Sequence, residues 1–452
     1  MLPVLYFRVR KKVFAAALLM LLAAGVFMFM TPRSPAPDEP TVPEQLRPVP
    51  DDGAVRYLTF QVFNGNRTVE IPWENTKPLI RTPKDSVEQL VDDIVATIGT
   101  RGTRNARLGF VLGPLALDHS DDDVRGMIAD AFAIAREKNL AVGFHLDDAM
   151  FWLNRKDLMS NPKNVEWIDW EGTPSDGLAI DWGKKERFPP RMCLNSPEVK
   201  TEVARRARDV IGGEIKAQID ALAREGRAEL FAGVIIGWES HMGHDFASDE
   251  RLGFCALSNA GFSPRNRPPS FGDEVQKIIK QSLEHWAKGL LEAGIAKEKL
   301  YAHISFLPES TFRYHQTRHP TLFFVKYTDV VNTAPSSSHP AVAFGENYLP
   351  GFSIYQNGAT IRAIHAALRE HGNPHWAQSE GTNVSPGLSG ANASASGMDM
   401  ETYLAQKFNY GATLVNMFAW GIGGDAFKDS PFRVATQSSE AISAYRKFLN
   451  QR

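Results

Sequence analysis

Two glutamates stand at the ends of predicted strands that are far apart in the chain. Glu239 follows the apolar run ELFAGVIIGW (229–238), and Glu380 closes the run HWAQSE (375–380). Cleavage of a glycosidic bond needs two facing carboxyl groups: one protonates the leaving oxygen, and the other attacks the sugar carbon or activates water. A separation of about 5–5.5 Å gives retention of configuration, and about 6.5–9.5 Å gives inversion. The pair predicts sugar cleavage, provided that the fold brings the two strand ends together.

The order of the predicted elements supplies such a fold. Short apolar strands alternate with amphipathic helices through the body of the chain. The predicted strands are 57–63, 107–113, 139–146, 229–238, 299–306, 340–345, 375–380 and 412–420. The predicted helices are 86–98, 121–139, 196–226, 271–294, 319–332, 358–372, 398–411 and 439–449. Eight βα units predict a single (β/α)8 barrel of the α/β class, with a doubly wound open sheet as the alternative.

The long connections all follow predicted strands. They span 147–195, 240–270, 346–357 and 381–398, whereas the connections from helices to strands are short. In a (β/α)8 barrel the loops after the strands build the active face. We therefore expect the chemistry at the carboxyl ends of the strands.

Several polar residues next to these strand ends are candidates for substrate binding through hydrogen bonds to sugar hydroxyls. They are His145, Asp147, Asp148, Glu346, Asn347 and Gln378. Capping of the loop is the alternative for the two aspartates, and Glu346 is a competing candidate for a catalytic carboxylate.

Tryptophans gather in the insertion after the third strand. Four of the nine in the chain lie there: Trp152, Trp167, Trp170 and Trp182. Flat, rigid aromatic faces stack on the apolar faces of sugar rings, so Trp152 and its neighbours are candidates for substrate contacts. A small core within the loop is the alternative.

Four short motifs resemble the clan-A glycoside hydrolases, which are retaining (β/α)8 enzymes. GWES (237–240) and QSEG (378–381) match the two glutamate positions, and FAWG (418–421) is similar to the segment whose tryptophan floors the sugar site. RMCLNSPE (191–198) is similar to a Cys-x-Asn-Ser-Pro segment of the β-galactosidase branch.

The resemblance implies a role for each matching residue. Glu239 becomes the acid/base, Glu380 the nucleophile and Trp420 the floor of the sugar site. Arg191 and Asn195 belong to the matching segment near the site. Trp238 stands where the clan has the asparagine that binds the sugar 2-hydroxyl. With Trp420 it is a candidate for the apolar wall that raises the pKa of a catalytic acid.

The sequence indicates no cofactor. It contains no G-x-G-x-x-G, P-loop or G-x-S-x-G motif. His241 and His244 lie close together after the fourth strand, but in a loop and at a spacing unlike that of helical metal ligands. We therefore expect no metal. A metal-dependent hydrolase that uses His241, His244 and Asp147 is the remaining alternative.

Composition narrows the range of partners. The chain has 452 residues with 50 Lys and Arg against 52 Asp and Glu, which argues against a nucleic-acid-binding protein. Two cysteines cannot form a disulfide scaffold. Cys193 and Cys255 fall in loops that neighbour each other in a barrel, and whether they pair is left open, as is the oligomeric state.

The amino terminus predicts attachment to a membrane. A basic flank (1–12) precedes 18 uncharged apolar residues (13–30), and a linker with seven prolines (31–53) follows. The apolar stretch suits an uncleaved anchor, with a cleaved signal as the alternative. Because a basic flank stays in the cytoplasm, the catalytic domain (54–452) is expected outside it, in the periplasm or the extracellular space.

Together these features predict a glycoside hydrolase that acts with retention on an oligo- or polysaccharide. A non-catalytic carbohydrate-binding barrel of an envelope polysaccharide system is the second hypothesis. The sugar, the linkage and the choice between endo and exo action are not determined by the sequence.

Overall fold

The computed structural model describes most of the chain from Gly53 to Gln451. The gaps are 64–76, 148–149, 176–177, 182–184, 238–241, 246–249, 305–312, 314–339, 356–357, 384–397 and 422–430. The apolar segment 13–30 and the helix predicted over 319–332 lie outside the described residues. Among the described helices, none has the length and hydropathy needed to cross a bilayer.

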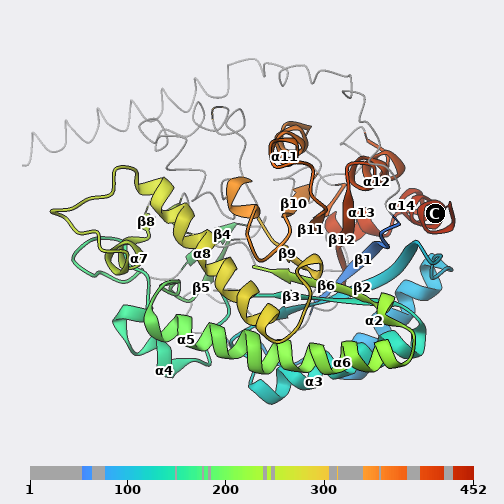
Figure 1. Ribbon diagram of the computed structural model, residues 1–452, viewed down its shortest axis with the longest axis horizontal. Coiled ribbons are helices and arrows are strands. Elements are labelled where there is room, and N and C mark those ends of the chain that lie inside the picture. Colours follow the sequence, from blue (N-terminus) through green and yellow to red (C-terminus); the bar gives the residue numbers. More distant parts are fainter. Residues whose placement is uncertain are drawn as a thin grey trace, which may run out of the picture. The chain divides into compact units, whose positions relative to one another are not determined.

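Eight parallel strands form the centre of the fold (Figure 1). They are β1 (Arg56–Phe63), β2 (Ala106–Leu115), β3 (Ala141–Leu146), β6 (Phe231–Ile236), β9 (Leu300–Ala302), β10 (Gly351–Tyr355), β11 (Trp376–Thr382) and β12 (Ala412–Gly421). Their order is β10-β11-β12-β1-β2-β3-β6-β9. Parallel bridges join Tyr301 to Leu349 and Ile304 to Phe352, so the two edges of the sheet meet. The predicted (β/α)8 barrel is confirmed.

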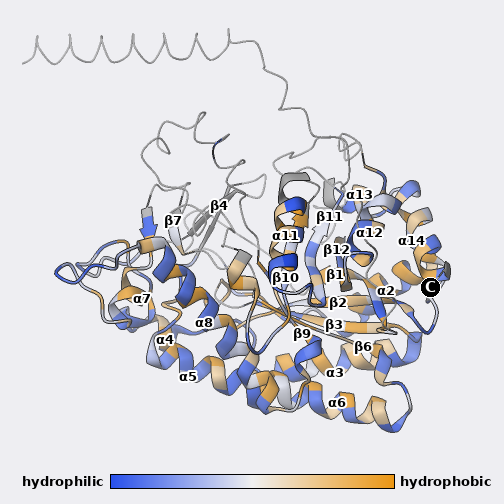
Figure 2. Ribbon diagram, turned by 45° about the horizontal axis from the view of Figure 1, so that its top comes forward, coloured by the Kyte–Doolittle hydropathy of each residue, from blue (hydrophilic) through white to orange (hydrophobic). Residues whose placement is uncertain are grey.

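Amphipathic helices surround the strands and turn their apolar sides inward (Figure 2). They include α2 (Lys84–Ile98), α3 (Asp121–Lys138), α5 (Pro197–Arg205), α6 (Gly213–Arg224), α8 (Phe271–Glu292), α11 (Gly358–Glu370), α12 (Met400–Phe408), α13 (Pro431–Thr436) and α14 (Ser439–Gln451). Local signals set their ends. In α3 the Ser120 side chain accepts a hydrogen bond from the Asp123 N–H, and Asn139 ends the helix in a left-handed conformation. The single helix predicted over 196–226 is divided by a π-helical segment, Arg206–Gly212.

The sixth strand is not where the sequence predicts it. Residues 340–343 form a 3-10 turn, and the strand is β10, beginning at Gly351. A short apolar run such as PAVAFG does not distinguish a strand from a buried turn, and here Val342 and Ala343 are buried in the main core without strand pairing. As a consequence, Glu346 and Asn347 precede the sixth strand instead of following it.

The connections after β3 and β6 are long, as predicted, and carry structure of their own. The first contains the hairpin β4 (Leu178–Asp181) and β5 (Lys185–Phe188), and the second contains β7 (Gly243–Asp245), β8 (Glu250–Leu252) and α7 (Phe254–Asn259).

Glu166, in the connection after β3, forms hydrogen bonds to the connection after β6. Its Oε1 accepts hydrogen bonds from the backbone N–H groups of Cys255 (2.7 Å) and Ala256 (3.3 Å) in α7 and from that of Trp167 (3.1 Å). The side chain is buried, and burial raises the pKa of its carboxyl to about 7 against the opposing effect of these N–H donors.

This raised pKa gives the stability a defined pH dependence. The folded protein holds the Glu166 proton up to about pH 7, whereas the unfolded chain loses it near 4.5. Stability therefore falls as the pH rises through this window, by about 3 kcal/mol in total. We expect urea denaturation from pH 4.5 to 8 to show no such decrease in the unfolding free energy of Glu166→Gln, because the glutamine amide does not titrate. Parallel curves for the variant and the wild type would contradict the assignment.

Cys193 and Cys255 are buried free thiols in neighbouring positions. The Asn259 Nδ2 lies 3.2 Å from Cys193 Sγ and 3.9 Å from Cys255 Sγ, so the predicted proximity of the two loops is confirmed.

Burial raises the pKa of the Cys193 thiol well above its ordinary value, which suppresses the reactive thiolate. In the native protein we expect both thiols to resist a disulfide-exchange reagent and to react together once urea unfolds the chain. Fast labelling of either thiol under native conditions would contradict this.

Candidate active site

A group of polar side chains lies inside the barrel near the carboxyl ends of the strands. Each comes from a different strand or strand end and is almost completely buried: Gln61 (β1), His145 (β3), His303 (after β9), Glu380 (β11) and Asn416 (β12). Buried polar groups need partners, and their hydrogen bonds run from one residue to the next around the barrel.

Asn416 is the centre of one half of this network. Its Nδ2 donates to Gln61 Oε1 (2.7 Å) and to the Ser379 carbonyl (2.9 Å), and its Oδ1 accepts from Thr59 Oγ1 (3.2 Å). Asn416 thereby links β12 to β1 and to the backbone immediately before Glu380.

Two histidine rings form the other half. His145 Nε2 lies 2.9 Å from His303 Nδ1 and 2.9 Å from the Gly237 carbonyl oxygen, and His145 Nδ1 lies 3.4 Å from Gln61 Oε1. Burial lowers the pKa of His303 to about 4 and that of His145 well below its ordinary value. Both rings are therefore neutral at neutral pH.

Glu380 completes the group. Its Oε2 lies 3.9 Å from His303 Nε2, and only 5% of the residue is exposed. Phe352 pairs with Gln378 and Ser353 pairs with Glu380, so Ser379 is an extra residue in β11. Such bulges redirect side chains next to active sites. Here Gln378 bonds to Tyr403 of α12, while Glu380 lies beside His303.

The end of β6, which precedes Glu239 in the sequence, reaches this group through Gly237. The Gly237 carbonyl oxygen lies 2.9 Å from His145 Nε2 and 3.3 Å from His303 Nδ1. Trp238 and Glu239 themselves lie outside the described residues, as does Asp148, so the pairing of the two glutamates stays a prediction.

Gln378 and Trp420 do not lie where a sugar-binding role requires. Gln378 is fully buried, and its amide bonds to Tyr403 and to the Asn416 carbonyl. Trp420 is also fully buried, and its Nε1 donates to Asp93 of α2 (2.8 Å). Trp420 therefore packs between β12 and α2, and the prediction that it floors the sugar site is wrong. A motif shows which residues stand together but not which side of the strand each one faces.

The predicted residues of the loop after β3 stabilise that loop. Trp152 has no exposed surface, packs in the main hydrophobic core instead of a separate loop core, and donates to the Pro190 carbonyl. Asp147 accepts from the N–H groups of Met150 and Phe151, which is its predicted capping alternative. Asn195 bonds to the Ala256 carbonyl of α7, and Arg191 is buried with its backbone carbonyl bonded to Glu166.

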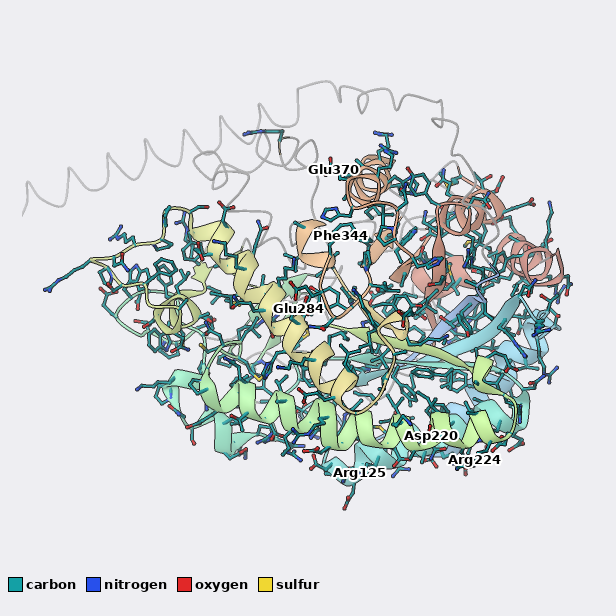
Figure 3. All side chains as sticks on the ribbon, in the orientation of Figure 1. Arg125, Asp220, Arg224, Glu284, Phe344 and Glu370 are labelled. Atoms are coloured by element: carbon teal, nitrogen blue, oxygen red, sulfur yellow. The ribbon has the colours of Figure 1, made fainter. Side chains whose placement is uncertain are left out.

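Glu346 and Asn347 are held by α8 at the amino end of β10. Glu284 Oε2 accepts from Asn347 Nδ2 (2.7 Å), and Glu284 Oε1 accepts from the Glu346 N–H. Figure 3 shows Glu284 on α8 beside the segment that carries Phe344. Because these residues precede β10, they lie at the opposite strand end from the one that follows Glu380, and the structure does not join them to the site.

Three members of the site were not predicted: His303, Gln61 and Asn416. Each is a polar residue within a mostly apolar run that the sequence predicts as a strand (57–63, 299–306 and 412–420), and this pattern is the signal that could have identified them. Phe418, two residues after Asn416, is the one residue of β12 that is not buried, so it presents an aromatic surface that Trp420 does not.

A charged cavity of about 690 Å³ lies around the start of α3, and no residue of the buried group lines it. Its lining includes Asp121, Arg205 and Arg206. Both arginines pair with Asp121, and Arg206 also donates to the carbonyls of Ala116 and His119. These charges are already paired, so the group inside the barrel remains the better candidate for catalysis.

No protein-family model and no curated protein matches the sequence. Among solved structures, the catalytic domain of β-amylase from Paenibacillus polymyxa has a TM-score of 0.50 at 9% identity and covers 87% of this chain and 98% of its own. An α-amylase from Geobacillus thermoleovorans in complex with acarbose has a TM-score of 0.36 at 10% identity, covering 88% and 78%. The 3-keto-D-glucoside 4-epimerase YcjR from E. coli has a TM-score of 0.30 at 11% identity, covering 87% and 97%.

The fold and the site together define a (β/α)8 barrel with a buried polar group at the carboxyl ends of its strands. The likeness to the β-amylase domain extends over nearly the whole of that domain and, at 9% identity, is a likeness of fold.

Proposed function

We propose that the chain is a glycoside hydrolase in which Glu380 is the nucleophile and Glu239 the acid/base, acting with retention on an oligo- or polysaccharide. The observation that carries the proposal is the position of Glu380: a carboxylate at the carboxyl end of a barrel strand, redirected by a bulge and supported by a buried network. Catalytic residues of (β/α)8 enzymes come from this end of the strands.

The surroundings of Glu380 suit a group that must stay in one orientation. Its neighbour His303 is neutral at neutral pH, because burial lowers the pKa of that ring to about 4. Asn416 fixes the Ser379 carbonyl next to it, which limits movement of the backbone.

The acid/base role of Glu239 is supported by its position in the chain. Gly237, two residues before it, contacts both histidines through its carbonyl oxygen, and His303 contacts Glu380. This places the end of β6 next to the end of β11 across the barrel. The similar fold of the β-amylase catalytic domain also supports a carbohydrate as the substrate.

The proposal includes a location. The basic flank and the apolar segment 13–30 support an anchored domain outside the cytoplasm, where polysaccharides of the envelope are accessible. The β-galactosidase-like branch is supported by the segment 191–198 alone.

The proposal is tested by assaying the full-length chain on a panel of aryl glycosides and polysaccharides. Proton NMR of the first product identifies its anomer. Hydrolysis with a retained anomer is expected. An inverted product would contradict the nucleophilic role of Glu380, and the absence of hydrolysis combined with polysaccharide binding would favour a non-catalytic carbohydrate-binding barrel.

A further inference from the structure

We propose that His145, His303 and Glu380 form a binding site for a divalent transition-metal ion such as Zn²⁺. Each residue offers one potential ligand atom, and these atoms all lie within 4.8 Å of one another. Two histidines and one carboxylate form a ligand set that zinc and related ions use in proteins. The sequence pattern does not indicate a metal here, because the three residues are separated by more than 70 positions in the chain.

One buried ring nitrogen of this group is unsatisfied among the described residues. His303 Nε2 has no hydrogen-bond partner among the described residues, and the His303 residue is only 1% exposed. It faces Glu380 Oε2 at 3.9 Å, which is too long for a hydrogen bond. Leaving a polar atom unpaired in this way is costly, and a ligand that pairs with it removes the cost.

The gap between His303 Nε2 and Glu380 Oε2 has a size that suits a metal ion. Zinc lies about 2.0–2.1 Å from histidine nitrogen and about 2.0–2.2 Å from carboxylate oxygen, so two such bonds span up to about 4.3 Å. The separation of 3.9 Å is within this reach. A tetrahedral ion draws the two atoms to about 3.4 Å, which requires a movement of only about half an ångström.

The Nδ1 atoms of the two rings lie next to oxygen acceptors. A histidine that binds metal through Nε2 usually donates its Nδ1–H to a neighbouring oxygen, which fixes the ring. Both rings have such an oxygen: Gln61 Oε1 lies 3.4 Å from His145 Nδ1, and the Gly237 carbonyl lies 3.3 Å from His303 Nδ1. An ion bound at His145 Nε2 replaces the present contacts of that atom with the Gly237 carbonyl oxygen and His303 Nδ1, both at 2.9 Å. Both Nδ1–H groups then have an acceptor.

Metal binding itself does not depend on the proposed function. One consequence of metal binding does rest on the proposed function. An ion bound to Glu380 occupies the carboxylate that the glycosidase needs as its nucleophile. The metal-bound and the substrate-cleaving states therefore exclude each other, and added Zn²⁺ should inhibit hydrolysis.

The test is calorimetric titration of the full-length chain with Zn²⁺ in a non-chelating buffer, followed by the absorption spectrum of the Co²⁺-loaded protein. One ion per chain is expected, with a Co²⁺ spectrum typical of four-coordinate nitrogen and oxygen ligands. Glu380→Gln and His303→Gln should weaken Zn²⁺ binding by at least about tenfold, because each removes a ligand while nearly preserving its volume. Circular dichroism and thermal unfolding confirm that each variant is folded.

The matched control is the double variant His241→Ala, His244→Ala, which removes the other histidine cluster of the sequence. It should bind Zn²⁺ as the wild type does. Binding that survives both Glu380→Gln and His303→Gln, or that is lost in the control, would overturn the proposal, as would the absence of binding to the wild type. Each of these results is read without an activity assay, so failure of the metal site is distinguishable from failure of the glycosidase.

Discussion

Glu380→Gln is expected to lower kcat/KM for the best glycoside substrate by at least about 1000-fold, which corresponds to about 4 kcal/mol of transition-state stabilisation. The amide has nearly the same shape as the carboxylate, so binding and folding should change little. It lacks the negative charge that attacks the sugar carbon. The loss should therefore appear in kcat, and thermal unfolding should confirm an intact fold.

Two further variants distinguish the role of Glu380 from a general effect of lost charge. Glu346→Gln removes an exposed carboxylate at the opposite strand end and should leave kcat/KM unchanged. Glu239→Gln should slow substrates with poor leaving groups far more than activated aryl glycosides, because a good leaving group needs little protonation. Equal losses in Glu346→Gln and Glu380→Gln would contradict the assignment of the nucleophile.

Asn416→Ala is expected to lower the free energy of unfolding by about 2–4 kcal/mol. The substitution removes the hydrogen bonds that Asn416 makes to Gln61 Oε1, the Ser379 carbonyl and the Thr59 hydroxyl. These three residues are buried inside the barrel, so water does not replace the lost partner. Urea denaturation at constant pH measures this loss. Because the Ser379 carbonyl precedes Glu380, kcat should fall as well.

The matched control for this variant is Asn450→Ala. Asn450 accepts a hydrogen bond from Thr100 Oγ1 at 3.1 Å, but on the exposed surface of α14, where water replaces the lost partner. Its substitution should change the unfolding free energy by less than about 0.5 kcal/mol. A similar loss in both variants would show that the network around Asn416 is not a special source of stability.

The barrel could be predicted from the sequence because its signals are local. β2, β6 and β12 are continuous apolar runs, as strands covered on both faces require, and α3 and α8 begin at serine caps. The sixth strand was predicted too early in the chain, because a short apolar segment buried in a turn has the same residue pattern as one buried in a strand. That error also moved Glu346 and Asn347 to the wrong end of the barrel.

The site could be predicted only in part, because its members meet through space. His145 and Glu380 were found from their positions at strand ends. His303 was not, since its role follows from contacts with His145 and Glu380 across the barrel. Trp420 and Gln378 were misassigned because the direction of a side chain depends on local register, and the bulge at Ser379 alters that register in β11.

The most direct test of the central claim is the distance between the carboxyl groups of Glu239 and Glu380 in a crystal structure. We predict that both face one cleft at the carboxyl ends of the strands, about 5–5.5 Å apart. A separation well beyond about 10 Å, or a Glu239 carboxyl directed away from the barrel, would contradict cleavage by this pair of residues.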